Sequence, residues 1–210
     1  LAADAGGVLL GVEHDVVNNA NLVDTHVEPA TEASKSLYAA PAIRLRQIIE
    51  RVSLNVPTPM RAPVEGPGLW ALESAMNELA EAVGVDPLDL RLANFAETSP
   101  ADGRPWSSNR LREAYEEGAR RYGWRDRHSR PRDDGPWRIG HGMATCSMGS
   151  FRLAGAARLR FSRDGSVVVE SNVHDIGTGA QTVLGQIAAE ELGVSPDRVT
   201  DDRSGQPYFS

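Results

Sequence analysis

The chain has 210 residues, is 40% hydrophobic, and carries 29 acidic against 22 basic side chains, a formal net charge of −7 at pH 7. This length suffices for one large domain or two small ones, and the acidic balance argues against a nucleic-acid-binding surface, for which a basic face is expected. Cys146 is the single cysteine, which excludes an internal disulfide, a CxxC metal pair and a Cys-ligated iron–sulfur cluster built from this chain, and no apolar run approaches membrane-spanning length.

The first quarter of the chain predicts two extended segments. Residues 7–17 read GVLLGVEHDVV, a strand-forming run, and the pair Asn18-Asn19 predicts a turn directly after it. Residues 43–56 alternate apolar and polar side chains and end before a proline, which predicts a second strand.

Three helices are expected next. The first has apolar residues at helical spacing at Leu72, Met76, Leu79 and Val83. Gly84 ends it, and Asp86 with Pro87 supplies the N-cap and first position of a second, short helix that we expect to end near Asn94. After a loop rich in proline, glycine and serine, Ser108 is expected to cap a third helix.

The mixture of strands and helices predicts an α+β fold in two parts. Residues 125–135, RDRHSRPRDDG, are charged, lack apolar anchors and contain a proline, which is typical of a linker. We therefore expect the domain boundary between residues 1–128 and residues 129–210.

Beyond this boundary the pattern becomes β-rich. Residues 137–147 are expected to form the first strand of the second part. Asp164-Gly165, a pair that accepts a positive φ, separates the β-forming runs 157–161 and 167–173 and predicts a hairpin.

The second strand of this hairpin leads to Gly177-Thr178-Gly179 and then to a helix, which Gly193 and Pro196 end. Glycines allow a ligand to approach the backbone closely, and the free N–H groups of a helix's first turn favour an anion. The pattern alone leaves an alternative open, in which the glycines only connect strand to helix and the threonine serves as the N-cap.

A proline-framed arginine forms the other candidate site. Arg61 lies within PTPMRAP, residues 57–63, where regular backbone hydrogen bonding is interrupted and a guanidinium offers a fixed fork of donors for oxo, phosphate or dithiolene acceptors. The alternative for an isolated arginine is a surface pair with Glu65 or Glu73.

Taken in order, MRAP, LWALESAMNELAEAVGVDPLDLRLANF at residues 69–95, and DIGTG followed by QIAAEELGV carry a family resemblance. From about Tyr38 to Val199 the chain resembles the large, molybdenum-cofactor-binding subunit of the xanthine dehydrogenase and aldehyde oxidase family. DIGTG in place of the commoner GQG form is similar to the bacterial aldehyde oxidoreductase branch. The resemblance implies that the two predicted domains are the C-terminal part of one molybdopterin-binding subdomain and the N-terminal part of the next.

The resemblance also implies roles for individual residues. The cofactor-contacting positions are Arg61, Ala62, Ile176, Gly177, Thr178 and Gly179, and the positions near the substrate are Pro63, Cys146 and Ser147. The metal is held by the pterin and needs no protein ligand. Val64 departs from the usual glycine of the MRAP segment, which places the local turn geometry in question.

The implied activity is oxidation of an aldehyde or N-heterocycle with water as oxygen source, and electrons leave through partner subunits that carry 2Fe–2S and FAD. A cytosine dinucleotide form of molybdopterin is expected. The family's catalytic glutamate belongs to a GVGE-like motif that this sequence does not contain, so no catalytic base is assigned. We expect a fragment of a longer subunit, inactive alone and cytoplasmic by default, with export through a partner's signal as the alternative. The rival hypothesis is a non-catalytic α+β interaction module.

Other polar and aromatic residues were given structural roles. His174 and Asp175 are neighbours on an extended segment and point to opposite faces, so proton transfer by the pair is not expected. The other histidines lack metal-ligand spacing, and Cys146 is expected to act as a small apolar residue. The tryptophans are expected to be packing anchors: Trp70, Trp106, Trp124 and Trp137.

Overall fold

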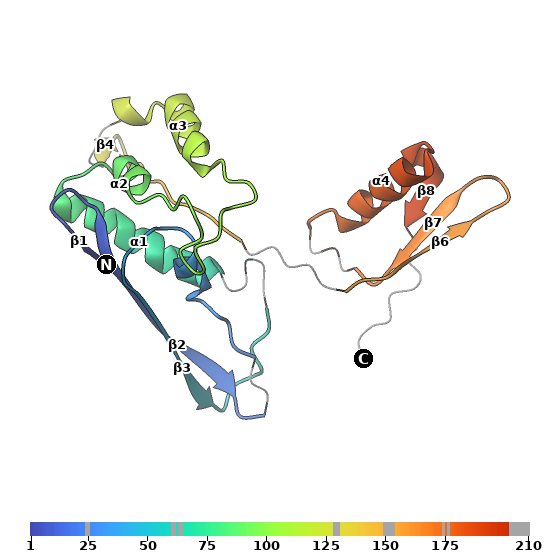
Figure 1. Ribbon diagram of the computed structural model, residues 1–210, viewed down its shortest axis with the longest axis horizontal. Coiled ribbons are helices and arrows are strands. Elements are labelled where there is room, and N and C mark those ends of the chain that lie inside the picture. The colour runs from blue at the N-terminus through green and yellow to red at the C-terminus, as the bar shows by residue number, and fades with distance from the viewer. Residues whose placement is uncertain are drawn as a thin grey trace. The chain divides into compact units, whose positions relative to one another are not determined.

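The computed structural model describes residues 1–23, 26–59, 62, 65–127, 131–148, 154–173, 175 and 177–201, and the chain divides into two compact units, residues 1–149 and 150–210. Helices and mixed sheets occur together, so the predicted α+β class is confirmed (Figure 1). Within the described ranges, no helix combines the length and apolar character needed to cross a membrane.

The first unit contains three α-helices and two small sheets among its described residues. Its elements are β1 (Ala2–Ala3), β2 (Leu9–Asn21), the 3-10 turn η1 (Glu32–Lys35), β3 (Ile43–Val52), α1 (Glu65–Val83), α2 (Pro87–Ala93), α3 (Leu111–Tyr122), the 3-10 turn η2 (Trp124–Asp126), β4 (Arg132–Asp134) and β5 (Trp137–Ile139).

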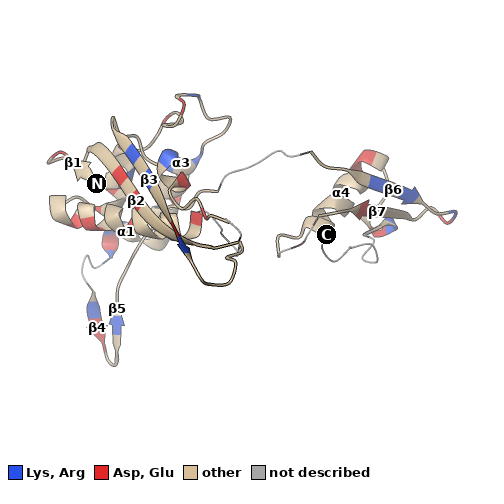
Figure 2. Ribbon diagram, turned by 90° about the horizontal axis from the view of Figure 1, so that it is seen from below, with Lys and Arg blue, Asp and Glu red and all other residues tan. Residues whose placement is uncertain are grey.

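Strand β2 runs parallel to β3, in register from Val12 opposite Ile43 to Asn21 opposite Val52. The turn predicted at Asn18-Asn19 is therefore wrong: β3 pairs with the backbone there, and the Asn18 side chain donates to the Glu28 carbonyl. Acidic residues of β2 face basic residues of β3 (Figure 2), as in the Asp15–Arg46 ion pair at 2.6 Å. The ladder and these pairs hold together a ribbon whose far end extends past α1 (Figure 1).

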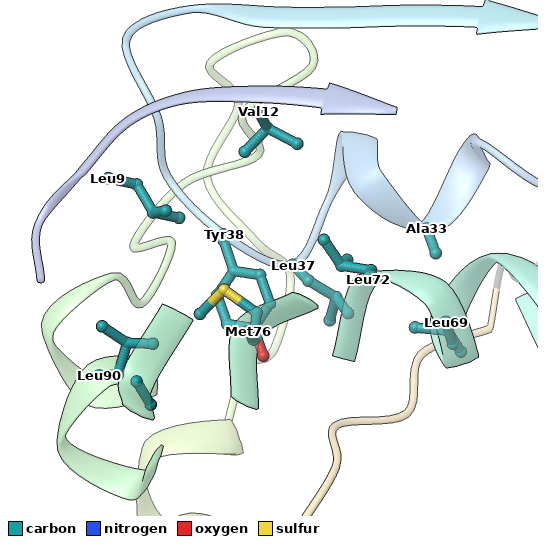
Figure 3. Packing of buried hydrophobic residues seen from close by; sticks show 10 residues of the cluster. Leu9, Val12, Ala33, Leu37, Tyr38, Leu69, Leu72, Met76 and Leu90 are labelled. Carbon is teal, nitrogen blue, oxygen red and sulfur yellow. The ribbon is translucent and has the colours of Figure 1, made fainter. Parts of the chain in front are cut away.

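The core of the first unit forms where α1 packs against the start of β2 and against η1 (Figure 3). The cluster comprises Leu9, Val12, Ala33, Leu37, Tyr38, Leu69, Leu72, Met76, Ala80 and Leu90. The backbone of α1 approaches the preceding loop very closely at Gly68, where a Cβ would lie 1.7 Å from the carbonyl oxygen of Ala30. No side chain fits there, so glycine is required for this contact.

Helix α2 begins as predicted. The Asp86 carboxylate caps it by accepting from the Leu88 N–H at 2.8 Å, with Pro87 at the first position. At its other end, buried Asn94 accepts from the Leu9 N–H at 2.7 Å and donates to the Gly7 carbonyl at 2.8 Å. This asparagine therefore ties the end of α2 to the start of β2.

The α3 region differs from its prediction at the cap. Asn109, not Ser108, accepts a hydrogen bond from the Leu111 N–H at 3.0 Å. One face of α3 packs through Tyr115 against Leu88 and Trp124. Trp106 donates to a carbonyl and Trp124 is buried, in agreement with packing roles, whereas Trp70 and Trp137 are exposed, so that role is wrong for these two.

The predicted linker contains an ordered hairpin. Strand β4 pairs with β5 across Gly135, whose φ is 61°, so this stretch is not an irregular linker throughout. The strand predicted at 137–147 ends at Ile139, and buried Thr145 is bonded to α1 and α3. The compact units divide at 149/150, and Met143 and Thr145 are bonded to α1; the expected domain bounds 1–128 and 129–210 stay a prediction. The assignment of the two parts as molybdopterin-binding subdomains stays a prediction.

The second unit is a small sheet with one covering helix. Its elements are β6 (Ala157–Phe161), β7 (Val167–Ser171), α4 (Ala180–Leu192), the 3-10 turn η3 (Pro196–Arg198) and β8 (Val199–Asp201). The predicted hairpin is confirmed, with Gly165 at φ 83°, and Gly193 ends α4 at φ 65°. Strand β8 then returns parallel to β7, which places the loop before α4 at one end of the sheet.

Candidate functional site

The residue that precedes α1 has an unusual backbone. Ala62 has φ 55°, in the left-handed region that glycine normally occupies, and its carbonyl accepts from the Gly66 N–H at 3.0 Å as α1 begins. An alanine in this region costs about 1–2 kcal/mol, so the surrounding structure must enforce it. Its neighbours Arg61 and Pro63, both predicted site residues, lie outside the described residues.

A cavity of about 370 Å³ lies between α1 and residues 144–148. It brings together Ala62 and the neighbouring residues Cys146 and Ser147, the positions that the family resemblance places near the cofactor and the substrate. Ala62 precedes the other two by more than 80 residues in the chain. From α1 the lining includes Leu69, Trp70, Glu73, Ser74 and Asn77. The cavity is therefore mainly apolar with a few polar groups, which is typical of a small-molecule site.

The wall that carries Cys146 is open to solvent. Cys146 and Met148 are exposed and Ser147 is half-buried, so the expectation that Cys146 is a buried apolar residue is wrong. On the helix side, Trp70 is 75% exposed. Apolar side chains at the cavity thus remain uncovered within this unit.

The deep side of the cavity contains a buried ion pair. The Glu73 side chain is 4% exposed and that of Arg91 0%, and two guanidinium nitrogens reach the carboxylate at 2.7 and 3.0 Å. Glu73 also accepts from the Tyr38 hydroxyl and from the Thr145 N–H at 2.6 Å. Burial raises the pKa of the Tyr38 hydroxyl, and the neighbouring Glu73 charge raises it further, so this phenol stays a donor.

This polar cluster was not predicted from the sequence. Glu73 falls between the apolar positions Leu72 and Met76 of the buried helix face, and a carboxylate there is the one signal that predicts a buried partner. The partner itself, Arg91, lies on α2, and neither its identity nor Thr145 could be read from spacing alone.

Asn77 leaves a hydrogen-bond acceptor free at the cavity. Its Nδ2 donates to the Met143 carbonyl at 3.4 Å, which fixes the orientation of the amide, and its buried Oδ1 has no partner among the described residues. An unpaired buried acceptor costs about 1–3 kcal/mol. A partner that carries an N–H or O–H donor would satisfy this acceptor.

The second candidate segment has the predicted order of strand, glycine-bracketed turn and helix. Gly177 has φ 104° and Gly179 φ 73°, and no described atom lies within 4 Å of a Cβ placed on Gly179. These glycines therefore serve the backbone conformation, not packing within the unit. Ile176 and His174 lie outside the described residues.

Asp175 holds this turn together. Its Oδ1 accepts from the N–H groups of Gly177 at 2.8 Å and Gly179 at 3.1 Å, and these bonds lower the pKa of the carboxyl. Asp175 is thus an acceptor within the turn, and the expectation that it does not transfer protons stays a prediction. Thr178 is exposed and is not the N-cap; that position is Gly179, for which the described residues supply no side-chain cap. The first-turn N–H groups of α4 remain available to a ligand.

The two segments belong to different compact units, and their predicted convergence on one cofactor stays a prediction. Among the described residues no group of three or more His, Cys, Asp or Glu side chains is placed to hold a metal ion.

Two family models with the same description, "Molybdopterin cofactor-binding domain", match residues 1–95 and 117–203. The chain belongs to the family of molybdopterin cofactor-binding domains, as the sequence resemblance predicts. Similar curated proteins include the aldehyde oxidoreductase molybdenum-binding subunit PaoC of Escherichia coli K12, 37% identical over 202 residues, and the putative xanthine dehydrogenase molybdenum-binding subunit XdhA of the same strain, 30% identical over 226 residues. The aligned residues make up 95% and 99% of the chain but only 28% and 30% of those subunits.

Solved structures agree on the fold. Quinoline 2-oxidoreductase of Pseudomonas putida 86 matches with a TM-score of 0.71 and 19% identity, covering 96% of this chain and 29% of that one. The aldehyde oxidoreductase of Desulfovibrio desulfuricans matches with a TM-score of 0.67 and 21% identity, covering 95% of this chain and 23% of that one. The fold of this chain is therefore that of one part of each of these two longer chains.

Proposed function

We propose that the chain is part of the molybdenum-binding subunit of an enzyme that oxidises aldehydes or N-heterocycles with water as the oxygen source. The observation that carries this proposal is the cavity shared by Ala62, Cys146 and Ser147, which the family resemblance had assigned independently to the cofactor and substrate surroundings. The family membership and the similarity to aldehyde oxidoreductase and xanthine dehydrogenase subunits support it.

The proposed roles of the chain's own residues are binding and positioning. Backbone N–H groups in the first turn of α4 donate to anionic groups of molybdopterin, and the guanidinium of Arg61 donates to its oxygen or sulfur acceptors. The cavity wall at Cys146 and Ser147 orients the substrate and limits its contact with water. When bound, the molybdenum cofactor supplies the two-electron redox chemistry.

The finer assignments are also proposals. We propose a cytosine dinucleotide form of the cofactor and transfer of electrons to partner subunits that carry 2Fe–2S and FAD. A further relative, 26% identical, is named as the gamma subunit of the 6-hydroxypseudooxynicotine dehydrogenase complex of Paenarthrobacter nicotinovorans, which supports assembly with other subunits. No catalytic base is assigned within these residues, and the 210-residue chain alone is expected to be inactive.

The test uses the full-length subunit with its partner subunits, expressed with cofactor supply. We expect molybdenum close to stoichiometric and oxidation of aromatic or aliphatic aldehydes. Arg61→Ala is expected to lower molybdenum content, and to lower kcat/KM roughly 100-fold through loss of one preorganised charged donor. Molybdenum is measured by inductively coupled plasma mass spectrometry and turnover with an artificial electron acceptor.

The matched control is Arg110→Ala, which removes an exposed arginine that pairs with Glu113 on the surface of α3. Both readouts should stay at wild-type values in this variant. Absence of molybdenum and of oxidation in the wild-type complex contradicts the proposed function and favours the interaction module. Unchanged readouts in Arg61→Ala contradict only the role of Arg61.

A further inference from the structure

Residues 140–148 have no helix or strand structure of their own, and residues 144–148 of this segment form one wall of the cavity. Side chains from other elements hold it. The Met143 carbonyl accepts from Asn77 at 3.4 Å and from Arg91 at 3.5 Å. Two residues further on, Thr145 is bonded through both its backbone and its side chain, so the position of this wall depends on buried polar contacts.

Thr145 is the buried residue of the wall formed by residues 144–148. Its N–H donates to Glu73 at 2.6 Å. Its hydroxyl is hydrogen-bonded to the hydroxyl of Tyr38 at 3.1 Å and to that of Tyr115. The residues that follow, Cys146 to Met148, are exposed or half-buried, so Thr145 is the anchor from which their positions are set.

Glu73 is in turn fixed by a single charged partner. Arg91 is fully buried, contacts the carboxylate through two nitrogens, and donates a further hydrogen bond to the Pro87 carbonyl at 3.0 Å. A buried ion pair of this kind is a poor source of stability, because two apolar residues of similar volume often stabilise a fold equally well or better. The pair does provide what an apolar pair lacks, a charged acceptor at one defined point of the cavity wall.

We propose that Glu73 is a positioning residue for the cofactor and substrate pocket: its carboxylate, oriented by Arg91, holds the N–H of Thr145 and thereby fixes Cys146 and Ser147 in the cavity wall. This inference rests on the proposed function of the cavity. Glu73 acts through Thr145, so its removal is expected to alter how the pocket is shaped while the apolar core around Leu72 and Met76 remains packed.

The first test is Glu73→Gln in the full-length subunit within its complex. The amide keeps the size of the side chain but replaces the charged acceptor with a weaker, neutral one. We expect kcat/KM for aldehydes to fall roughly 10- to 100-fold, mostly through a higher KM, because a slightly displaced wall orients the substrate less well. Hydrogen exchange supplies a readout independent of turnover. Amides of residues 144–148 should exchange faster in the variant, with or without cofactor, while those of α2 keep their protection.

The second test keeps Glu73 and Arg91 intact, in case the first variant fails to fold. Thr145→Val removes only the hydroxyl bonded to the two tyrosines, whereas Thr145→Ser retains it. We expect Thr145→Val to raise KM and accelerate exchange of the wall, and Thr145→Ser to recover most of the loss. If Thr145 contributes only to stability, the two variants should differ from the wild type in the midpoint of thermal unfolding but not in KM.

The outcomes separate the two proposals. If the wild-type complex contains molybdenum and oxidises aldehydes, but Glu73→Gln leaves KM and exchange of residues 144–148 unchanged, the positioning role is refuted and the proposed function stands. If the wild-type complex lacks molybdenum, the proposed function fails, and the positioning role for a pocket of that enzyme fails with it even where exchange of the wall responds to Glu73→Gln.

Discussion

Thr145 and Gly179 lie in the two segments assigned to the cofactor and substrate surroundings, and the protein holds these segments by different means. The wall at Thr145 is fixed by a buried network that joins residues of α1, α2 and α3. The turn at Gly179 is fixed by one exposed carboxylate, Asp175, four residues away. The contacts that hold the wall also join three helices of the core, whereas the contacts that hold the turn lie within five residues. Mutations in the buried network should therefore destabilise several elements, and mutations in the turn should affect only the turn and the start of α4.

The largest effect is expected from breaking the buried network. Arg91→Ala leaves the Glu73 carboxylate buried and unpaired, which is expected to lower the free energy of unfolding by about 3–5 kcal/mol. This loss is measured by urea denaturation of the full-length subunit, with hydrogen exchange of the α1 amides as the readout. Arg110→Ala removes an exposed ion pair and should change stability by less than about 0.5 kcal/mol. Equal effects in the two variants would show that the network adds nothing to the core.

An intermediate, local effect is expected at the start of α4. Gly179→Ala places a Cβ at φ 73°, which costs about 1–2 kcal/mol although the space around it is open among the described residues. Gly185→Ala is the matched control in the interior of the same helix, where the added methyl meets nothing described and should stabilise by about 0.5–1 kcal/mol. Hydrogen exchange of α4 should therefore move in opposite directions in the two variants. Changes of the same sign would contradict a backbone role for Gly179.

The smallest effect is a pH dependence of the same turn. Hydrogen bonds from the Gly177 and Gly179 N–H groups lower the pKa of Asp175, so the folded-state pKa lies below that of the unfolded chain. The contribution of Asp175 is then complete above the ordinary carboxyl pKa and is lost as the pH falls through the folded value. Amide exchange at the start of α4, corrected for its intrinsic pH dependence, should show reduced protection in that acidic range.

Asp175→Asn is the control for this titration, because the amide oxygen still accepts both N–H groups but does not ionise. The variant should lack the acidic loss of protection at α4. A wild-type pH profile that the variant reproduces would assign the effect to other carboxylates. Asp164 is one candidate in the second unit, because hydrogen bonds from the N–H and the hydroxyl of Ser166 lower the pKa of its carboxyl.

Local sequence signals predicted the elements that depend on near neighbours. Asp86-Pro87 marks the start of α2, Gly165 the hairpin and Gly193 the end of α4, because each acts through a cap or a positive φ within a few residues. The turn predicted at Asn18-Asn19 was wrong, because the pairing of β2 with β3, which is distant in sequence, overrides the local turn preference. Pairings across long sequence separations are not encoded in local spacing.

The candidate site was predictable to a similar extent. Ala62, Cys146 and Ser147 came from the family resemblance, and the structure unites them in one cavity. The Glu73–Arg91 pair and the anchor at Thr145 were missed, because a carboxylate on an apolar helix face predicts that a partner exists but not which one. Helix packing decides that choice, through the crossing of α1 with α2.

The absence of a side chain at Gly68 also constrains how this pocket can change. Because α1 meets the carbonyl of Ala30 at backbone distance, a shift that brought a neighbouring Cβ to the place of Gly68 would collide with that carbonyl. Altered ligand preference would then have to arise from exchanging side chains that border the hollow, such as Leu69 or Ser74, and not from shifting the helix. Changes to the shape of this cavity are therefore expected to depend on the volumes of the side chains that line it, while the backbone of α1 keeps its position.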